Sequence, residues 1–253
     1  MIGTAALIGI ADIILHAIKV IEPPKVNRLD GSFWEKMWMP IKDRGFRQWI
    51  IILSLWHLGM YVAAPFCTPY LIGRVEDGCL GMDMLTTVFA IFILKFIGKA
   101  IGFLPMGRAI DQCGAKPVLI MGNFCWCFVP FFYGFSTPQT VFVMIGTCQI
   151  LAGIFILSAS SNAIEVVKLQ LSHKDDKVMY LAVLAVCFTA SGAIGAFIGS
   201  LIVKEWGIQT VFVWGLGARL LMFPAIFFLK MPNQKRVRDV FKMWWRALYN
   251  GKE

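Results

Sequence analysis

Seven long stretches of apolar residues dominate the chain. They cover residues 2–20, 49–72, 84–104, 118–135, 139–164, 178–203 and 209–229. A helix rises about 1.5 Å per residue, so each stretch is long enough to cross a hydrocarbon core about 30 Å thick. None of them alternates apolar and polar residues as a barrel strand does, and lipid cannot satisfy an open backbone. The pattern therefore predicts an all-α, polytopic membrane helical bundle of about seven transmembrane helices.

The first stretch has features that separate it from a cleaved signal peptide. It begins at Met1, and its basic residue, Lys19, follows the apolar run instead of preceding it. No small-x-small cleavage pattern comes after it. Asp12 and His16 share one helix face, a spacing compatible with a metal or proton site but more typical of a hydrogen-bonded pair. We therefore expect a genuine membrane helix over 1–20.

Composition supports a membrane protein over a soluble one. Hydrophobic residues make up 58% of the chain, charged residues 15%, and the mean hydropathy is +0.70. Soluble domains carry about 25% charged residues. These values exclude a disordered chain and give no support to a nucleic-acid partner, although the net charge is +9.

The positive charge falls on alternate connections. Eighteen Lys and Arg residues lie in 21–48, 105–117, 168–177 and the tail from Lys230, whereas the other connections contain Arg74 and Lys204. By the positive-inside rule, this distribution predicts a multi-pass protein of the plasma (inner) membrane with its N-terminus outside and its C-terminus in the cytoplasm.

Two cytoplasmic segments have amphipathic patterns. Apolar residues recur at helical spacing from Phe33 to Ile41 and again from Val240 to Leu248, with basic residues between them. Both patterns predict helices at the membrane interface, with docking of a partner as the alternative. The expected parts are a helix at 1–20, an amphipathic interdomain loop at 21–48, a six-helix unit at 49–230 and a basic tail at 231–253.

Residues 107–117 read GRAIDQCGAKP and carry a recognisable spacing of glycine, acid and base. The segment resembles the G-x-x-x-D-R-x-G-R-K-P loop of the major facilitator superfamily, with Gln112 and Ala115 in place of basic residues. Glycines permit a tight turn between two helices, and Pro117 suits the first turn of the next helix. The resemblance assigns a gating role on the cytoplasmic side to Gly107, Asp111, Gly114 and Lys116.

The resemblance extends over the whole chain. Other segments that carry it are Leu55-Trp56 with residues 63–66, residues 162–171, and the glycines at 192, 195 and 199. It maps 1–20 to the sixth helix of the family, 21–48 to the central loop and the remainder to helices seven to twelve. It therefore implies the C-terminal half of a twelve-helix transporter whose N-terminal half is missing, through truncation or a late start codon, or as a true half-size protein.

Ionisable and polar residues inside the apolar stretches are costly and call for a role. By resemblance, the helices that line the substrate cavity contain His57, Lys95 and Gln149, whereas Arg219 falls on a peripheral helix and is more typical of a structural role. Glu165 lies at the inner end of its stretch. We take Lys95, His57, Gln149 and Glu165 as candidate solute- or ion-pathway residues, with snorkelling or structural pairing as the alternative.

The patterns of small residues and cysteines say less about function than the polar residues do. The Gly98-x-x-x-Gly102 and Gly195-x-x-x-Gly199 patterns predict close helix packing. The seven cysteines show no metal or redox spacing, and a disulfide is conceivable only between Cys67 and Cys79. We therefore expect no metal site and no cofactor.

The predicted function is secondary active transport of a small solute by alternating access, as symport or antiport. An anionic solute would suit Lys95. The other expected partners are membrane lipids and the missing N-terminal half. No phosphate-binding loop, nucleophile elbow or dinucleotide fingerprint occurs, so the chain is not expected to be an enzyme. The alternatives are a non-transporting half-size membrane protein or partner-binding subunit and, with less support, an intramembrane enzyme.

Overall fold

The structure is a computed structural model that describes residues 33–172, 177–231 and 235–249. The chain divides into two compact units, Met1–Lys36 and Met37–Glu253, and the account below concerns the second. The predicted helix at 1–20, with Asp12 and His16, lies outside the described residues. The described residues form helices and turns and contain no strand, which confirms the all-α class.

Six helical stretches in the described chain are long and apolar enough to span a membrane. They are Arg44–Ile72, Met84–Cys113, Ala115–Gly134, Val141–Leu171, Lys177–Trp206 and Thr210–Phe228. The helices that make up these spans are, in order, α3 (Arg44–Tyr61), η1 (Ala64–Phe66) and α4 (Cys67–Ile72); α5 (Met84–Val88), η3 (Phe89–Ile93) and α6 (Leu94–Cys113); α7 (Ala115–Cys127) and α8 (Val129–Gly134); α9 (Val141–Leu151), η4 (Ala152–Ser160) and α10 (Ser161–Leu171); α11 (Lys177–Trp206); and α12 (Thr210–Met222) and η5 (Phe223–Phe228).

Several spans extend beyond their apolar stretches at the basic end. The first described span begins at Arg44, not at residue 49, because Asp43 caps it: its Oδ1 accepts from the backbone N–H groups of Gly45 and Phe46, at 2.9 and 3.3 Å. Hydropathy marks the hydrocarbon crossing, whereas capping and backbone hydrogen bonds decide where the helix ends.

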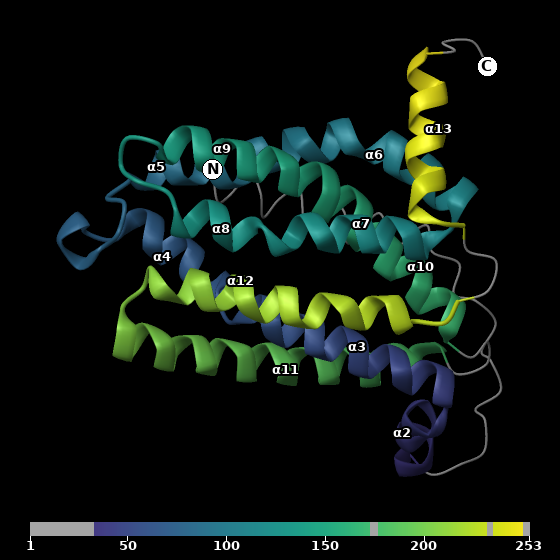
Figure 1. The fold of residues 1–253 in the computed structure, drawn as a ribbon. Coiled ribbons are helices and arrows are strands. Elements are labelled where there is room, and N and C mark those ends of the chain that lie inside the picture. Colours follow the sequence, from purple (N-terminus) through teal and green to yellow (C-terminus); the bar gives the residue numbers. More distant parts are fainter. Residues whose placement is uncertain (1–32, 173–176, 232–234, 250–253) are drawn as a thin grey trace, which may run out of the picture. The chain divides into compact units, whose positions relative to one another are not determined.

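The spans pack as two groups of three (Figure 1). In one group, α6 and α7 both pack against η4; in the other, α11 and α12 both pack against α3. Contacts between α8 and α12 join the groups. The spans Ala115–Gly134 and Thr210–Phe228 therefore connect the two halves of this bundle.

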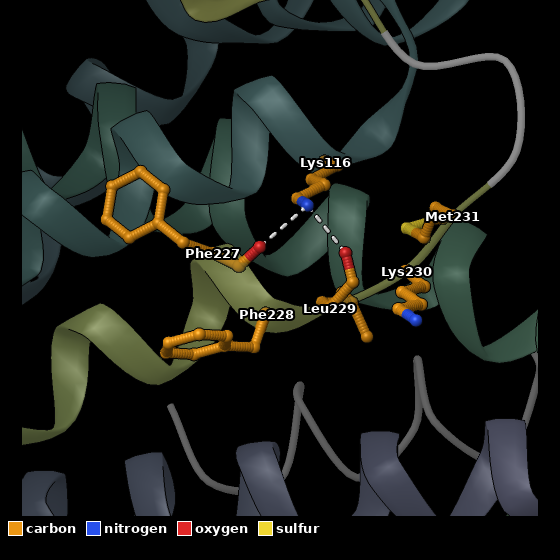
Figure 2. A pocket seen from close by; sticks show the side chains of 6 residues that line it. All are labelled: Lys116, Phe227, Phe228, Leu229, Lys230 and Met231. Atoms are coloured by element: carbon orange, nitrogen blue, oxygen red, sulfur yellow. Dashed lines mark hydrogen bonds between the residues drawn. The ribbon is translucent and has the colours of Figure 1, made fainter.

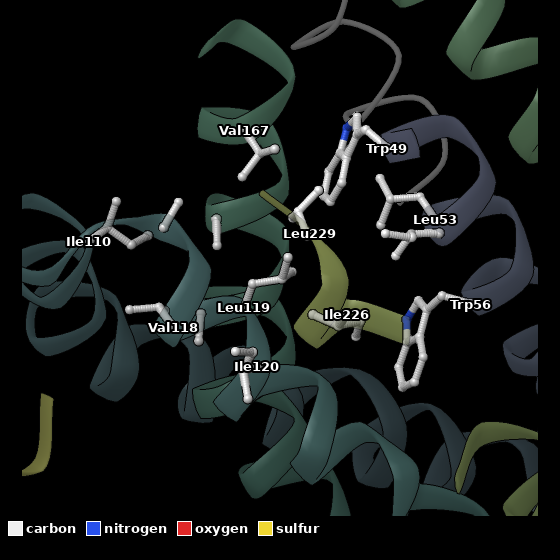
Figure 3. Close-up of a cluster of buried hydrophobic side chains, with 14 of the residues drawn as sticks. Trp49, Leu53, Trp56, Ile110, Val118, Leu119, Ile120, Val167, Ile226 and Leu229 are labelled. Carbon is white, nitrogen blue, oxygen red and sulfur yellow. The ribbon is translucent and has the colours of Figure 1, made fainter. Parts of the chain in front are cut away.

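Buried apolar residues form two clusters. The cluster toward the basic end includes Trp49 and Trp56 of α3, Leu119 of α7, and Ile226 and Leu229 around the end of η5 (Figure 3). The other cluster is centred on Tyr70, Tyr133 and Phe212, where the rings of Tyr133 and Phe212 stack with centroids 5.4 Å apart.

Departures from regular α-helix occur near prolines and in two π-helical segments. Pro65 lies in η1, Pro69 in α4, Pro130 at the start of α8 and Pro224 in η5. Proline lacks the N–H that a continuous helix requires. The π-helices are η3 and η4; such segments are rare and concentrate at functional sites.

Two shorter helices match the predicted amphipathic segments. They are α2 (Phe33–Lys42) and α13 (Val237–Tyr249). In α13 the side chains are described as far as Trp244. The α13 ribbon runs across the ends of the neighbouring spans instead of continuing one (Figure 1), and it packs against α6 and α7. Its location at a membrane interface stays a prediction.

Candidate functional site

Lys95 lies where two helices touch backbone to backbone. A Cβ atom added to Gly98 would collide with the carbonyl oxygen of Ile150, and one added to Gly153 would collide with that of Lys95 itself. Glycine is required at such approaches because any side chain would separate the helices. The predicted packing role of Gly98 is confirmed, and the first turn of α6 is held tightly against η4.

The side chains of Lys95 and Lys99 are half-buried. Within the described part of the chain, neither ammonium has a hydrogen bond or an ion pair. Lys95 lies eleven residues after Met84, about 17 Å along the span. A cation at this depth is costly unless it faces water, pairs with an anion or reaches the interface by snorkelling.

Ser158 reinforces the same contact between helices. Its hydroxyl lies 2.9 Å from the carbonyl oxygen of Lys99 and 3.1 Å from that of Gly153. Because a π-helix displaces the regular backbone pairing, a hydroxyl can bind carbonyl groups there. Lys95 and Lys99 therefore lie on a helix that packs against the π-helical segment η4, and the hydroxyl of Ser158 bridges the two.

Gln149 lies inside the bundle. It is 3% exposed, and its Nε2 donates to the hydroxyl oxygen of Tyr133 at 2.8 Å. Its Oε1 has no partner among the described residues. This hydrogen bond connects α9 to α8, so Gln149 is buried between spans and not displayed on an open face.

His57 belongs to the other group of spans. Its Nδ1 lies 3.1 Å from the carbonyl oxygen of Phe188 on α11, and its ring centroid is 4.8 Å from that of Tyr61 and 5.0 Å from that of Phe188. Since the span begins at Arg44, His57 is about 20 Å from that end and close to mid-span. The imidazole is half-buried at the α3–α11 contact.

Glu165 pairs with a neighbour on its own helix. Its Oε1 is 2.6 Å from the ammonium of Lys168, and the Glu165 side chain is 65% exposed. Exposed pairs at this spacing contribute little stability.

The candidate residues therefore fall into two groups. Lys95 and Gln149 lie on α6 and α9, which pack against each other, whereas His57 lies on α3, which packs against α11. The structure provides no contact between the two groups, as far as the described residues extend.

The segment 107–117 is not a loop of the predicted form. Gly107 and Asp111 lie within α6, which continues to Cys113, and the turn into α7 is made at Gly114 alone, with φ of 91°. The helix persists because its backbone bonds continue as far as the Gly114 N–H, which donates to the Ile110 carbonyl at 2.9 Å. Only Gly114 therefore needs the freedom of glycine. The carboxylate of Asp111 is exposed and unpartnered within the described chain.

Lys116 binds a distant part of the chain. Its ammonium donates to the carbonyl oxygen of Phe227 at 3.0 Å and to that of Leu229 (Figure 2). These carbonyls lie at the end of the last span, where helical acceptors lack partners and cations are favoured. An open pocket of about 530 Å³ surrounds this contact, and Lys230 also lines it.

Arg219 is the buried charge whose partners the sequence does not reveal. It is 1% exposed, and its Nη1 and Nη2 donate to the carbonyl oxygens of Trp126 and Met60 at 2.9 and 3.1 Å. It therefore joins three spans. Two features of the sequence could have indicated this role of Arg219. It is an arginine in an apolar stretch, and Pro130 lies four residues after Trp126, whose carbonyl therefore lacks its regular helical donor.

A sequence model described as Major Facilitator Superfamily matches residues 80–249. The chain belongs to the major facilitator superfamily. Members of this superfamily are membrane transporters that carry small solutes, so the chain is an integral, multi-pass membrane protein whose function is membrane transport. Searches of curated proteins and of solved structures found no match.

No group of three or more His, Cys, Asp or Glu side chains that could hold a metal occurs in the described ranges. The seven cysteines are free thiols, including Cys67 and Cys79. Burial raises the pKa of Cys79, which lies outside the spans. The candidate residues offer an ammonium at Lys95, an imidazole at His57, an amide at Gln149 and a carboxylate at Glu165.

Proposed function

We propose that the chain is the C-terminal half of a secondary transporter that moves a small solute by alternating access, as symport or antiport. A second six-helix half would close the cavity against the face carrying Lys95 and His57. The protein would lie in the inner membrane with its basic end in the cytoplasm, as the charge distribution indicates.

The supporting observation is the distribution of polar side chains at membrane depth. In the spans that contain α3, α6, α10 and α11, the side chains of His57, Lys95, Asn162 and Thr189 are partly or fully exposed, although others in these spans, such as Gln149, Ser158 and Ser191, are buried. In the other two spans, Asn123, Tyr133 and Arg219 are buried. Polar groups in a membrane face a bundle interior or water, so the four spans that contain α3, α6, α10 and α11 are the best candidates to line a solute pathway.

Lys95 supplies the positive charge of this pathway. An ammonium without a protein partner in the described chain would bind an anionic solute, or a carboxylate of the second half. His57 would exchange protons close to mid-span, because an imidazole ring can both accept and donate a proton. Gln149 would lie behind the side chains that line the pathway and would position Tyr133 through its hydrogen bond. Glu165 would lie at the cytoplasmic opening of the pathway beside Lys168.

The exposed carboxylate of Asp111 would contribute to gating. It lies on the last turns of α6, at the end where Gly114 turns the chain into α7. A basic residue or helix N-terminus of the second half would attract it. Gly107 and Lys116 would support this role, Lys116 by fixing the neighbouring end of the last span.

The proposal is tested by water accessibility at Lys95. The chain is reconstituted in lipid vesicles with its native cysteines replaced by serine, and Lys95→Cys is treated with a charged, membrane-impermeant methanethiosulfonate reagent. We expect Lys95→Cys to react at least tenfold faster than Phe96→Cys. Phe96 is 56% exposed on the next position of α6 and serves as the matched control.

The comparison distinguishes a pathway from a lipid-facing surface. Phe96 is the more exposed of the two residues in the isolated chain, but only a water-filled pathway permits the thiolate reaction inside a membrane. Equal and slow reaction at both positions would remove Lys95 from the pathway and favour a non-transporting subunit.

A further inference from the structure

The helix α13 has two faces with different surroundings. Val240 is fully buried, and Met243 and Trp244 pack against the same core cluster, which includes residues of α6 and α7. The indole Nε1 of Trp244 donates to the carbonyl oxygen of Pro105 at 3.4 Å. Just before the helix, the Lys235 N–H donates to the Cys113 carbonyl at 3.0 Å. The docked face therefore holds α13 on the segment that joins α6 to α7.

The opposite face combines two cations with an aromatic ring. Arg238, Phe241 and Lys242 are exposed, with Phe241 at 54%. Their spacings of three and four residues place them together on one side of the helix. Asp239 lies between the two faces, and its Oδ2 accepts from the backbone N–H of Arg236 at 3.1 Å. Its charge therefore caps the helix start and does not occupy the basic face.

The direction of α13 determines what this face can meet. The helix crosses the end of the span Met84–Cys113 and extends past it (Figure 1). A helix that leaves a membrane bundle sideways at the end of its spans runs at the depth of lipid headgroups. Basic side chains with an adjacent aromatic ring match this environment, because the cations meet phosphates and the ring enters the acyl boundary.

We propose that the Arg238–Phe241–Lys242 face of α13 binds the phosphates of anionic phospholipids in the adjacent leaflet. In this arrangement the lipid surface holds α13, and α13 holds the turn at Gly114 through its docked face. The proposal does not depend on transport, because it concerns a surface outside the pathway residues.

The test uses hydrogen exchange of the full chain in lipid nanodiscs. The amides of residues 237–244 are followed in phosphatidylcholine alone and with about 30% phosphatidylglycerol. Each cation near an anionic surface favours binding by about fivefold, so we expect exchange of these amides to slow by up to about thirtyfold in the anionic lipid. High salt should remove the difference.

Variants assign the effect to the basic face. Arg238→Gln with Lys242→Gln should abolish most of the lipid dependence, Arg238→Lys with Lys242→Arg should retain it, and Lys204→Gln, at the other end of the bundle, should leave it unchanged. Equal exchange in the two lipids, or a lipid effect that survives the double glutamine variant, would overturn the proposal. Slowing by inorganic phosphate in phosphatidylcholine to the same extent would also overturn it, since the ligand would then be free phosphate.

Discussion

The guanidinium of Arg219 donates to the carbonyl oxygen of Trp126, whose usual helical partner would be the N–H of Pro130. Proline has no N–H, so this carbonyl lacks its regular donor, and Arg219 Nη1 binds it at 2.9 Å. The second nitrogen binds the Met60 carbonyl near the end of α3, where the chain breaks ahead of Pro65. One arginine therefore satisfies acceptors near helix breaks in two neighbouring spans.

Replacing Arg219 with methionine should destabilise the bundle. Two buried carbonyl groups would lose a charged donor, at about 1–3 kcal/mol each, and the relief of burying a charge would offset part of this. We expect a net loss of about 2 kcal/mol in the free energy of unfolding, measured by sodium dodecyl sulfate titration in mixed micelles. Arg74→Met, on an exposed connection, should have no effect. An unchanged unfolding midpoint for Arg219→Met would show that these hydrogen bonds do not stabilise the fold.

Two helical glycines, Gly153 and Gly107, should respond in opposite ways to substitution by alanine. Gly153→Ala places a methyl group against the backbone of Lys95 and should separate α6 from η4, at a cost of about 1–3 kcal/mol. Gly107→Ala meets nothing within 4 Å in α6 and should stabilise the helix by about 0.5–1 kcal/mol. The same micelle titration measures both. Destabilisation by Gly107→Ala would indicate that this residue is needed for a turn after all.

The spans and the family could be predicted from sequence because each depends on local patterns. Apolar stretches located all six described spans, and residues 107–117 identified the superfamily. Long-range partners could not be predicted in the same way: the contact of Lys116 with Leu229 joins positions 113 residues apart. The burial of Gln149 depends on Tyr133 of another span, and the continuation of α6 through Gly107 depends on backbone bonds that hydropathy does not register.

Asp83 should stabilise the start of α5 in a pH-dependent manner. Hydrogen bonds from the Thr86 side chain and backbone lower the pKa of Asp83 from its ordinary value of 3.8. The contribution is therefore complete above pH 3.8 and is lost as the pH falls through the lowered pKa. Asp83→Ala should speed exchange of the amides of 84–88 at neutral pH, after correction for intrinsic rates, and should match the native chain once the carboxylate is protonated. A difference that persists unchanged at low pH would contradict a role for the charge.

Lys116 should act first as a cap on the last span. Its ammonium binds the Phe227 and Leu229 carbonyls, which end a helix and have no further helical donors. Lys116→Met should therefore cost about 1 kcal/mol of unfolding free energy, a value reduced by the partial exposure of the site. Lys116→Arg keeps the charge and donors and should retain most of the stability.

A capping role and a purely gating role of Lys116 differ in which part of the protein loses stability when the residue is replaced. A cap supports its own half of the protein, so Lys116→Met should increase amide exchange near Leu229 and Lys230 in the isolated chain, without any second half present. Asp111→Asn, on the same segment but exposed, is the matched control and should leave exchange there unaltered. If instead both variants leave stability and exchange untouched, the charge of Lys116 would serve contacts outside the described bundle, and the two carbonyls would be satisfied by water.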